Sequence, residues 1–337
     1  MRIVLTSYWF SPSVGGVQTS SKIFAEEFAK AGHSVTVVTN TPGPASEGPY
    51  QVVRQPSYRT LLKLGNQSDL IFQNLISLRI LVPLLLCRKP IVIKHASWLR
   101  LNDGSKRRGF RHSTKLPFLY LATNVATNRS IAGDLPVRCE LIGNPFEIYE
   151  FEGLRARPRD RDIVFMGRLV SDKGCDLLLQ AVGRLKSKGI SPTVTVIGDG
   201  PEMPALKRLA EELCIADQIT FTGILREGRG EVVARHRVMA IPSLWDEPFG
   251  VVALEGISAG CAIVASVGGG LVEAVGPCGL LFPNGDAEAL AAALERVLSD
   301  SVLREQLLSK GPDHLRNFQP GIIARQYLDL FQRLITV

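Results

Sequence analysis

The chain has 337 residues, more than one hydrophobic core usually covers, so we expect two domains. Its composition, 45% hydrophobic and 21% charged, is that of a soluble globular protein, and its longest apolar run, residues 80–87, is too short to span a bilayer. The net charge of +7 is uneven: residues 1–153 hold 18 Lys or Arg against 10 Asp or Glu, whereas residues 154–337 hold 21 against 22, so the first half is expected to meet something anionic.

Two further features predict a cytoplasmic protein. The opening residues enter an apolar run without a basic region, a long apolar stretch or a cleavage site, so a secretory signal is not expected. The six cysteines are scattered and lack metal-ligand spacing, which is typical of buried, reduced thiols.

The first half begins with strand, helix and strand. Residues 2–7 form an apolar run suited to a buried parallel strand, and residues 17–33 form an amphipathic helix that ends near a glycine. A second strand follows at residues 34–39, which gives the repeating unit of a parallel α/β sheet. Further strands are expected at 69–72, 90–94, 124–128 and 139–145, and a helix at 75–87.

The same rhythm restarts in the second half, after a charged stretch at residues 147–161 that is expected to be a linker. A strand over 162–166 leads through a turn into a helix, and the next strand and helix repeat this pattern. We therefore predict two doubly wound α/β domains, with ligands at the carboxyl ends of the strands and in the cleft between domains. Later strands are expected at 218–223, 238–243, 261–266 and 279–282, and helices at 286–298 and 302–311.

One turn of the second half combines Gly167, Arg168 and Lys173 just before a helix. Two cations near a helix N-terminus form an anion site, because unpaired N–H groups and the helix dipole add to their charge. The alternative is a pair of solvated cations on a surface loop, and the turn alone leaves the two interpretations evenly balanced.

Two other strand-to-helix turns are rich in glycine. Gly198 lies in "VIGDGP", where the backbone can approach a ligand or simply make a tight turn. Gly15 and Gly16 precede the first helix of the chain, in a turn that either binds phosphate or acceptor or only connects two elements. The turn is not GxGxxG, so a nicotinamide dehydrogenase is the least expected function.

Glu247 and Glu255 stand on either side of the start of an apolar, small-residue helix. Pro248 breaks the preceding structure, and Gly250 and Val251 offer free N–H groups at the helix N-terminus, suited to phosphate. Burying an unpaired carboxylate is costly, yet Glu255 has apolar neighbours. Two hydrogen bonds from a vicinal diol, as at the ribose of dinucleotide sites, would satisfy that charge.

Together these motifs resemble the group 1 (family 4) retaining glycosyltransferases. The E-x7-E spacing in "EPFGVVALE" resembles the family signature, "GRLVSDKG" its diphosphate-binding run, and "VIGDGP" its G-x-G-P turn. The likeness covers essentially the whole chain in the expected order. One run departs from the family pattern, with Pro145 where the family has glycine and Glu147 where it has aspartate, so we assign this run no role.

The resemblance implies a GT-B fold, in which two Rossmann-like doubly wound parallel-sheet domains face each other across a deep interdomain cleft. The implied domains are an N-terminal acceptor-binding domain over residues 1–153 and a C-terminal nucleotide-sugar-binding domain over residues 154–313. A C-terminal helix over residues 314–337 is expected to cross back to the first domain. The resemblance also implies a retaining, metal-independent hexosyltransferase that needs no cofactor besides its nucleoside-diphosphate-sugar donor.

Roles for individual residues follow from the same resemblance. Arg168 and Lys173 would bind the donor diphosphate, Glu255 the ribose, and Glu247 the donor sugar. His95 would lie near the reacting sugar, or else be a structural polar residue at a strand end. The expected catalytic residues are thus His95, Glu247, Arg168 and Lys173. The expected donor-binding residues are Gly16, Gly167, Arg168, Lys173, Gly198, Glu247, Phe249, Gly250, Val251 and Glu255.

No metal ligand is expected. The single D-x-D pair, Asp160 and Asp162, lies in the expected linker and is interpreted as solvated charge. Fixed cations and helix N-termini would instead stabilise the charge that develops on the departing diphosphate.

Residues 98–121 combine six Lys or Arg, Arg100 and Lys106 among them, with leucine, phenylalanine and tyrosine. Such a segment can lie on an anionic membrane, form a solvated face, or contact a phosphorylated acceptor, whereas no pattern supports nucleic acid. The preferred hypothesis is a peripheral enzyme on the inner face of the membrane. It would extend a saccharide or lipid-linked acceptor in bacterial-type polysaccharide, lipopolysaccharide or glycolipid synthesis.

Two other functions remain open at this point. The first is a nucleotide-sugar epimerase on the same fold, which would act on the donor without an acceptor. The second is a non-catalytic nucleotide-binding partner subunit. The sequence leaves the donor base and sugar, the acceptor, the linkage and the oligomeric state open.

Overall fold

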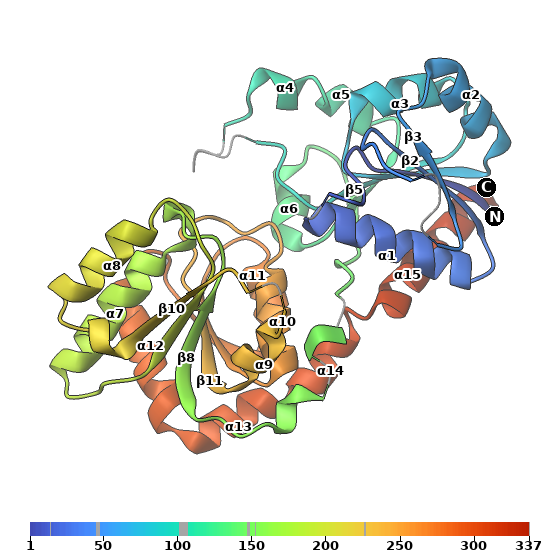
Figure 1. The fold of residues 1–337 in the computed structure, drawn as a ribbon. Coiled ribbons are helices and arrows are strands. Elements are labelled where there is room, and N and C mark those ends of the chain that lie inside the picture. Colours follow the sequence, from blue (N-terminus) through green and yellow to red (C-terminus); the bar gives the residue numbers. More distant parts are fainter. Residues whose placement is uncertain are drawn as a thin grey trace. The chain divides into compact units, whose positions relative to one another are not determined.

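The computed structural model describes residues 1–13, 15–44, 48–100, 107–146, 149–151, 153–225 and 227–336. The chain forms two compact units, which we describe separately (Figure 1). Unit 1 comprises Met1–Phe146 and Asn317–Val337, and unit 2 comprises Glu147–Arg316.

Unit 1 is built on a seven-stranded parallel sheet with the order β3-β2-β1-β4-β5-β6-β7. The order reverses beside β1, since β2 and β3 extend the sheet on one side and β4 to β7 on the other. This is the doubly wound arrangement. The strands are β1 (Arg2–Thr6), β2 (Ser34–Thr39), β3 (Gln51–Arg54), β4 (Leu70–Asn74), β5 (Ile91–His95), β6 (Thr123–Ala126) and β7 (Cys139–Leu141).

The end of the chain completes the core of unit 1, where α15 packs on α1 (Figure 1). The buried residues of α15 recur at helical spacing, and its Tyr327 and Phe331 join Phe24, Phe28 and Phe72 in one aromatic cluster. The helices of unit 1 are α1 (Gly16–Lys30), α2 (Tyr58–Gln67), α3 (Leu78–Leu85), α4 (Phe110–Ser113), α5 (Leu116–Leu119), α6 (Arg129–Asp134) and α15 (Pro320–Ile335).

Unit 2 repeats the plan with six parallel strands in the order β10-β9-β8-β11-β12-β13, which reverses between β8 and β11. The strands are β8 (Arg161–Met166), β9 (Val194–Ile197), β10 (Ile219–Gly223), β11 (His236–Ile241), β12 (Ala262–Ser266) and β13 (Gly279–Phe282). The α-helices are α7 (Cys175–Ser187), α8 (Met203–Glu212), α9 (Arg229–Ala234), α10 (Val251–Ala259), α11 (Leu271–Val275), α12 (Ala287–Ser299), α13 (Ser301–Ser309) and α14 (Gly311–Arg316). The 3₁₀ turns are η1 (Tyr149–Phe151), η2 (Leu154–Ala156), η3 (Ser171–Lys173), η4 (Ala216–Gln218) and η5 (Gly276–Cys278).

The predicted α/β class with two doubly wound parallel sheets is confirmed. The expected linker at 147–161 differs from the prediction, because its described part packs onto unit 2. Phe151 and Leu154 are buried, and the Arg155 guanidinium donates to the carbonyl oxygens of Ile257 at 2.9 Å and Leu308 at 2.7 Å. Arg155 thus satisfies carbonyl groups near the ends of α10 and α13, which explains how a charged residue of this segment packs onto unit 2.

The cysteines and the hydropathy of the helices can also be compared with the sequence-based predictions. All six cysteines are free thiols, and four of them are buried as expected. Cys139 is only half-buried, and Cys214 is exposed because it lies in the turn after α8. Among the helices of the described residues, none combines the length and apolar character that crossing a membrane requires.

Candidate functional site

The candidate site lies in unit 2, where the strand order reverses. The loops that follow β8 and β11 leave the sheet side by side, at the carboxyl ends of two neighbouring strands. In open α/β sheets this position is where ligands bind, because the two loops diverge to opposite sides of the sheet. Arg168 and Lys173 lie in the first loop, and Glu247 lies in the second.

Close backbone contacts fix the turn that carries Gly167. Its N–H group donates to the carbonyl oxygen of Ile197 at 3.0 Å, and Gly198 packs against its carbonyl oxygen. A Cβ at Gly198 would lie 1.8 Å from that oxygen, and its φ of +138° also favours glycine. The predicted Gly167 and Gly198 therefore meet each other, and their contact positions the neighbouring Arg168.

The two cations of this turn differ in their surroundings. Arg168 is exposed, and its guanidinium makes no hydrogen bond or ion pair with other described residues. Lys173 instead donates to Oε1 of Glu247, which also accepts a hydrogen bond from Ser243 at 2.8 Å. The Lys173 and Glu247 side chains are only 20% and 13% exposed. Two residues predicted to bind different parts of a donor are thus paired with each other here.

Backbone hydrogen bonds hold the Glu247 loop from both sides. The carbonyl oxygen of Glu247 accepts from the N–H of Gly270 at 2.7 Å, and Leu244 donates its N–H to the carbonyl of Asp172 at 2.9 Å. Sequence reasoning missed this support and the role of Ser243. The glycine run after β12 could have predicted the contact between Gly270 and Glu247, because glycines allow two loops to approach each other closely.

Helix α10 begins directly after this loop. Its N-cap is Gly250, with a φ of +93° and no side-chain cap, and Val251 is the first helical residue. Phe249 is buried and anchors the turn. The first N–H groups of α10 therefore start beside Glu247, as the sequence predicts for an anion-binding helix end.

Glu255 lies within α10, and its side chain is 14% exposed. Nη2 of Arg229 lies 3.0 Å from its Oε1. Burial raises the pKa of the Glu255 carboxyl, and the Arg229 charge opposes that shift. Sequence reasoning missed Arg229, because this residue lies in a short polar stretch far from Glu255 along the chain.

His95 and Gly16, the two site residues predicted in unit 1, lie in different surroundings. Gly16 is the exposed first residue of α1. His95 ends β5 and is 1% exposed, and burial lowers its pKa to about 4, so its imidazole is neutral at pH 7. Asn124 directs its amide nitrogen to the carbonyls of Leu119 and Ala122, so its oxygen, 2.9 Å from His95 Nε2, accepts the ring proton. This arrangement leaves Nδ1 of His95 as an acceptor.

The D-x-D carboxylates pair with arginines. Asp160 accepts hydrogen bonds from Arg235, and Asp162 accepts one from Arg237 at 3.0 Å. In the part of the chain that the structure describes, no group of three or more His, Cys, Asp or Glu residues is placed to hold a metal ion.

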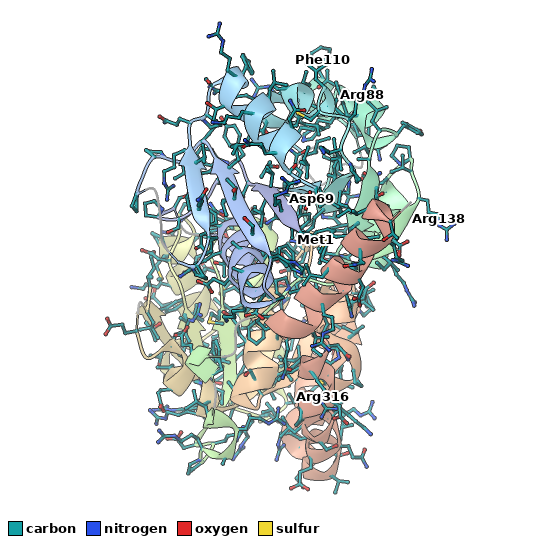
Figure 2. All side chains as sticks on the ribbon, turned by 90° about the vertical axis from the view of Figure 1, so that its right-hand side faces the viewer. Met1, Asp69, Arg88, Phe110, Arg138 and Arg316 are labelled. Carbon is teal, nitrogen blue, oxygen red and sulfur yellow. The ribbon has the colours of Figure 1, made fainter. Side chains whose placement is uncertain are left out.

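The basic segment at 98–121 is covered only in part, since residues 101–106, including Lys106, lie outside the described residues. Arg100 differs from the expectation of a surface cation. It is buried, because its guanidinium stacks 3.9 Å from the centre of the Trp98 ring and faces Asp134 at 3.8 Å. Phe110 is 84% exposed, and Figure 2 shows it at the top of the view, in unit 1.

Unit 2 matches a known protein family. Residues 149–314 match the model of "Glycosyl transferases group 1". The lipopolysaccharide core biosynthesis glycosyltransferase LpsD of Rhizobium meliloti is 36% identical over 180 residues, which cover 51% of this chain and 49% of that protein. The D-inositol 3-phosphate glycosyltransferase of Corynebacterium urealyticum is 35% identical over 187 residues, covering 52% and 43%. The chain spans about half the length, or less, of the curated relatives it matches.

Solved structures match both units. The structure of Anabaena HepE in complex with UDP has a TM-score of 0.80 at 18% identity, covering 99% of this chain and 100% of that one. Sucrose-phosphate synthase from Thermosynechococcus elongatus has a TM-score of 0.79 at 23% identity, covering 99% of each chain. The chain therefore has the GT-B fold. Unit 2 is a group 1 glycosyltransferase domain, which confirms the family that the sequence motifs resemble.

Proposed function

We propose that the protein transfers a sugar from a nucleoside-diphosphate sugar to a saccharide or lipid-linked acceptor, with retention of configuration and without a metal ion. One observation carries this proposal. The loop that holds Arg168 and Lys173 lies next to the loop that holds Glu247 and leads into α10, at the point where the strand order of unit 2 reverses. The relatives named above, which act in lipopolysaccharide core synthesis and on inositol phosphate, and the neighbour solved with UDP, support it.

The donor diphosphate would bind between the two loops. Arg168 is exposed, so its guanidinium can bind a phosphate directly. Lys173 would first have to break its hydrogen bond to Glu247 and then donate to a phosphate oxygen. That exchange frees one oxygen lone pair of Glu247 for a hydroxyl of the donor sugar, while Ser243 keeps the carboxylate in place. The same two cations and the N–H groups of α10 would stabilise the diphosphate as it departs.

The nucleoside would be held through Glu255. Among the described residues only Oε1 of this carboxylate is engaged, by Arg229, so Oε2 can accept a hydrogen bond from a ribose hydroxyl. The predicted ribose contact and the observed Arg229 contact are therefore compatible.

For the reaction itself, we propose attack on the face from which the diphosphate leaves. The departing phosphate oxygen would take the proton of the acceptor hydroxyl, and the sugar would move to the acceptor oxygen with its configuration retained. His95 would contribute as a neutral imidazole, whose Nδ1 can accept a hydrogen bond from a sugar hydroxyl. The backbone of Gly16, at the start of α1, would contact donor or acceptor.

The test is an assay of donor turnover with purified protein and a panel of nucleoside-diphosphate sugars. We expect release of the nucleoside diphosphate to depend on a saccharide or lipid-linked acceptor and to persist in EDTA. Conversion of the donor to an isomer without acceptor would identify an epimerase instead. Binding of donor without turnover, under any acceptor tested, would favour the non-catalytic partner subunit.

We also propose that unit 1 docks on the anionic inner face of a membrane through the described part of residues 98–121. Arg107 and Arg111 are exposed and stand on either side of the exposed Phe110 along the chain, a combination that favours an anionic lipid surface. We expect the protein to float with anionic liposomes at low salt, and Phe110→Ser with Arg111→Ser to reduce the floated fraction several-fold. Val302→Ser, which replaces an exposed apolar residue of unit 2, is the control. Wild-type protein that stays in the soluble fraction would contradict this proposal.

A further inference from the structure

One guanidinium nitrogen joins three elements of unit 2. Arg229 is the first residue of α9. Its Nη2 donates to Oε2 of Glu150 at 2.6 Å and lies 3.0 Å from Oε1 of Glu255. Glu150 belongs to η1 and Glu255 to α10. The carboxylate predicted to bind ribose is thus tied to the first residues of unit 2 through a single arginine.

Packing around Arg229 limits where its side chain can go. The guanidinium lies 5.4 Å from the centre of the Phe151 ring, and Phe151 itself is buried. Helix α9 also presses on η1, since a Cβ at Gly230 would lie 2.2 Å from the carbonyl oxygen of Glu150. Arg229 is therefore anchored by η1 independently of its contact with Glu255.

Arg229 counteracts the other influences on the pKa of the Glu255 carboxyl. Burial raises the pKa of the Glu255 carboxyl, and the neighbouring Glu150 raises it further, whereas Arg229 lowers it. Arg229 is the cation in contact with Glu255, so it favours the ionised form, which accepts hydrogen bonds more strongly than the neutral acid.

We propose that Arg229 is a positioning residue for nucleotide recognition, which holds Glu255 through Oε1 so that Oε2 accepts a hydroxyl of the donor ribose. This inference rests on the proposed function. It extends that function by making the discrimination between ribose and deoxyribose depend on a residue that does not itself touch the sugar. The opposite role, in which Arg229 occupies Glu255 and competes with the nucleotide, predicts a change of opposite sign.

The test compares the Kd of the nucleoside diphosphate that binds the wild type with the Kd of its 2′-deoxy analogue, by calorimetry in EDTA. Hydrogen bonds to a charged group suggest that the wild type prefers the ribonucleotide by about 10- to 100-fold. We expect Arg229→Ala to reduce this preference to about threefold or less and Arg229→Lys, which keeps a cation, to retain most of it. Arg235→Ala removes an exposed arginine that is paired with Asp160, and should leave the preference unchanged.

Three results would overturn the inference. A preference that is unchanged in Arg229→Ala would show that Glu255 needs no positioning. Tighter binding of the ribonucleotide by Arg229→Ala would show that the arginine competes with ribose. If the wild type binds no nucleoside diphosphate at all, both the proposed function and this inference are wrong. The first two results, in contrast, contradict only the inference about Arg229. If Arg229→Ala does not fold, Arg229→Gln takes its place, because it also removes the cation beside Glu255 and should reduce the preference in the same way.

Discussion

Replacing Lys173 with alanine is expected to lower kcat/KM for sugar transfer by about 10²- to 10³-fold, the usual effect of removing one fixed charge that stabilises a leaving group. The reason is twofold in this structure. Lys173 is one of two cations of the β8 loop, and it also neutralises the largely buried Glu247. Its loss removes an attraction for diphosphate and leaves a carboxylate that repels it.

The second effect can be separated from the first with nucleoside diphosphate alone, which lacks the donor sugar. We expect Lys173→Ala to bind it much more weakly than wild type, and Lys173→Ala with Glu247→Gln to recover part of that loss. Lys186→Ala is a control, because Lys186 is in α7 and interacts with Asp217 and Cys214 instead. Equal Kd values for the single and double variants would show that Glu247 does not act on the diphosphate.

A second large effect is expected at Lys94, which is fully buried in unit 1. Its Nζ donates to Oδ1 of Asn74 at 3.1 Å and lies 5.3 Å from the centre of the Phe24 ring. Burial lowers the pKa of Lys94 to about 7 from its ordinary value of 10.5. The folded protein therefore holds a neutral amine between these two values, where the unfolded chain still binds a proton.

The sign of the pH effect follows from this difference. Because the unfolded state binds more protons, the free energy of unfolding rises with pH between about 7 and 10.5, by at most about 1.4 kcal/mol per pH unit. Below pH 7 both states are protonated, so the full penalty is present. Lys94→Met removes the penalty, although it leaves Asn74 without its donor, and should stabilise unit 1 by about 2–4 kcal/mol at pH 7.

The measurement is urea-induced unfolding at pH 7, 8, 9 and 10, following Trp9 and Trp98 of unit 1 in a Trp245→Phe background. The difference between Lys94→Met and the parent should shrink as the pH rises. Lys63→Met, at an exposed position of α2, should show no such trend. A difference that stays constant from pH 7 to 10 would mean that Lys94 does not titrate in this window.

The sequence predicted the sheets well, because buried parallel strands are continuous apolar runs between turns. It missed β3 and α2, since "QVVR" has only two apolar residues and α2 contains polar residues and a glycine. It placed Arg168, Lys173 and Glu247 in loops at the carboxyl ends of β8 and β11, because glycines and prolines mark where strands end.

What the sequence missed are contacts between segments that only the fold brings together. Arg229 reaches Glu255 because α9 leads into β11 and α10 follows it, so the two helices pack against each other. The pairing of Lys173 with Glu247 depends on β8 and β11 being neighbours in the sheet, although two strands separate them in the chain. His95 was placed at a strand end, but its burial against Asn124 depends on the register of β5 and β6. The catalytic and binding roles of these residues remain predictions.

The most direct test of the central claim, a metal-independent nucleotide site on unit 2, is a thermal-shift screen of uridine, guanosine and adenosine diphosphates and their sugars in EDTA. A ligand that binds only the folded state raises the melting temperature. We predict that the diphosphates of one base stabilise the wild type in EDTA, and that this shift is lost in both Arg168→Ala and Glu255→Ala. Stabilisation that requires a divalent metal, or that persists unchanged in both variants, would contradict this account.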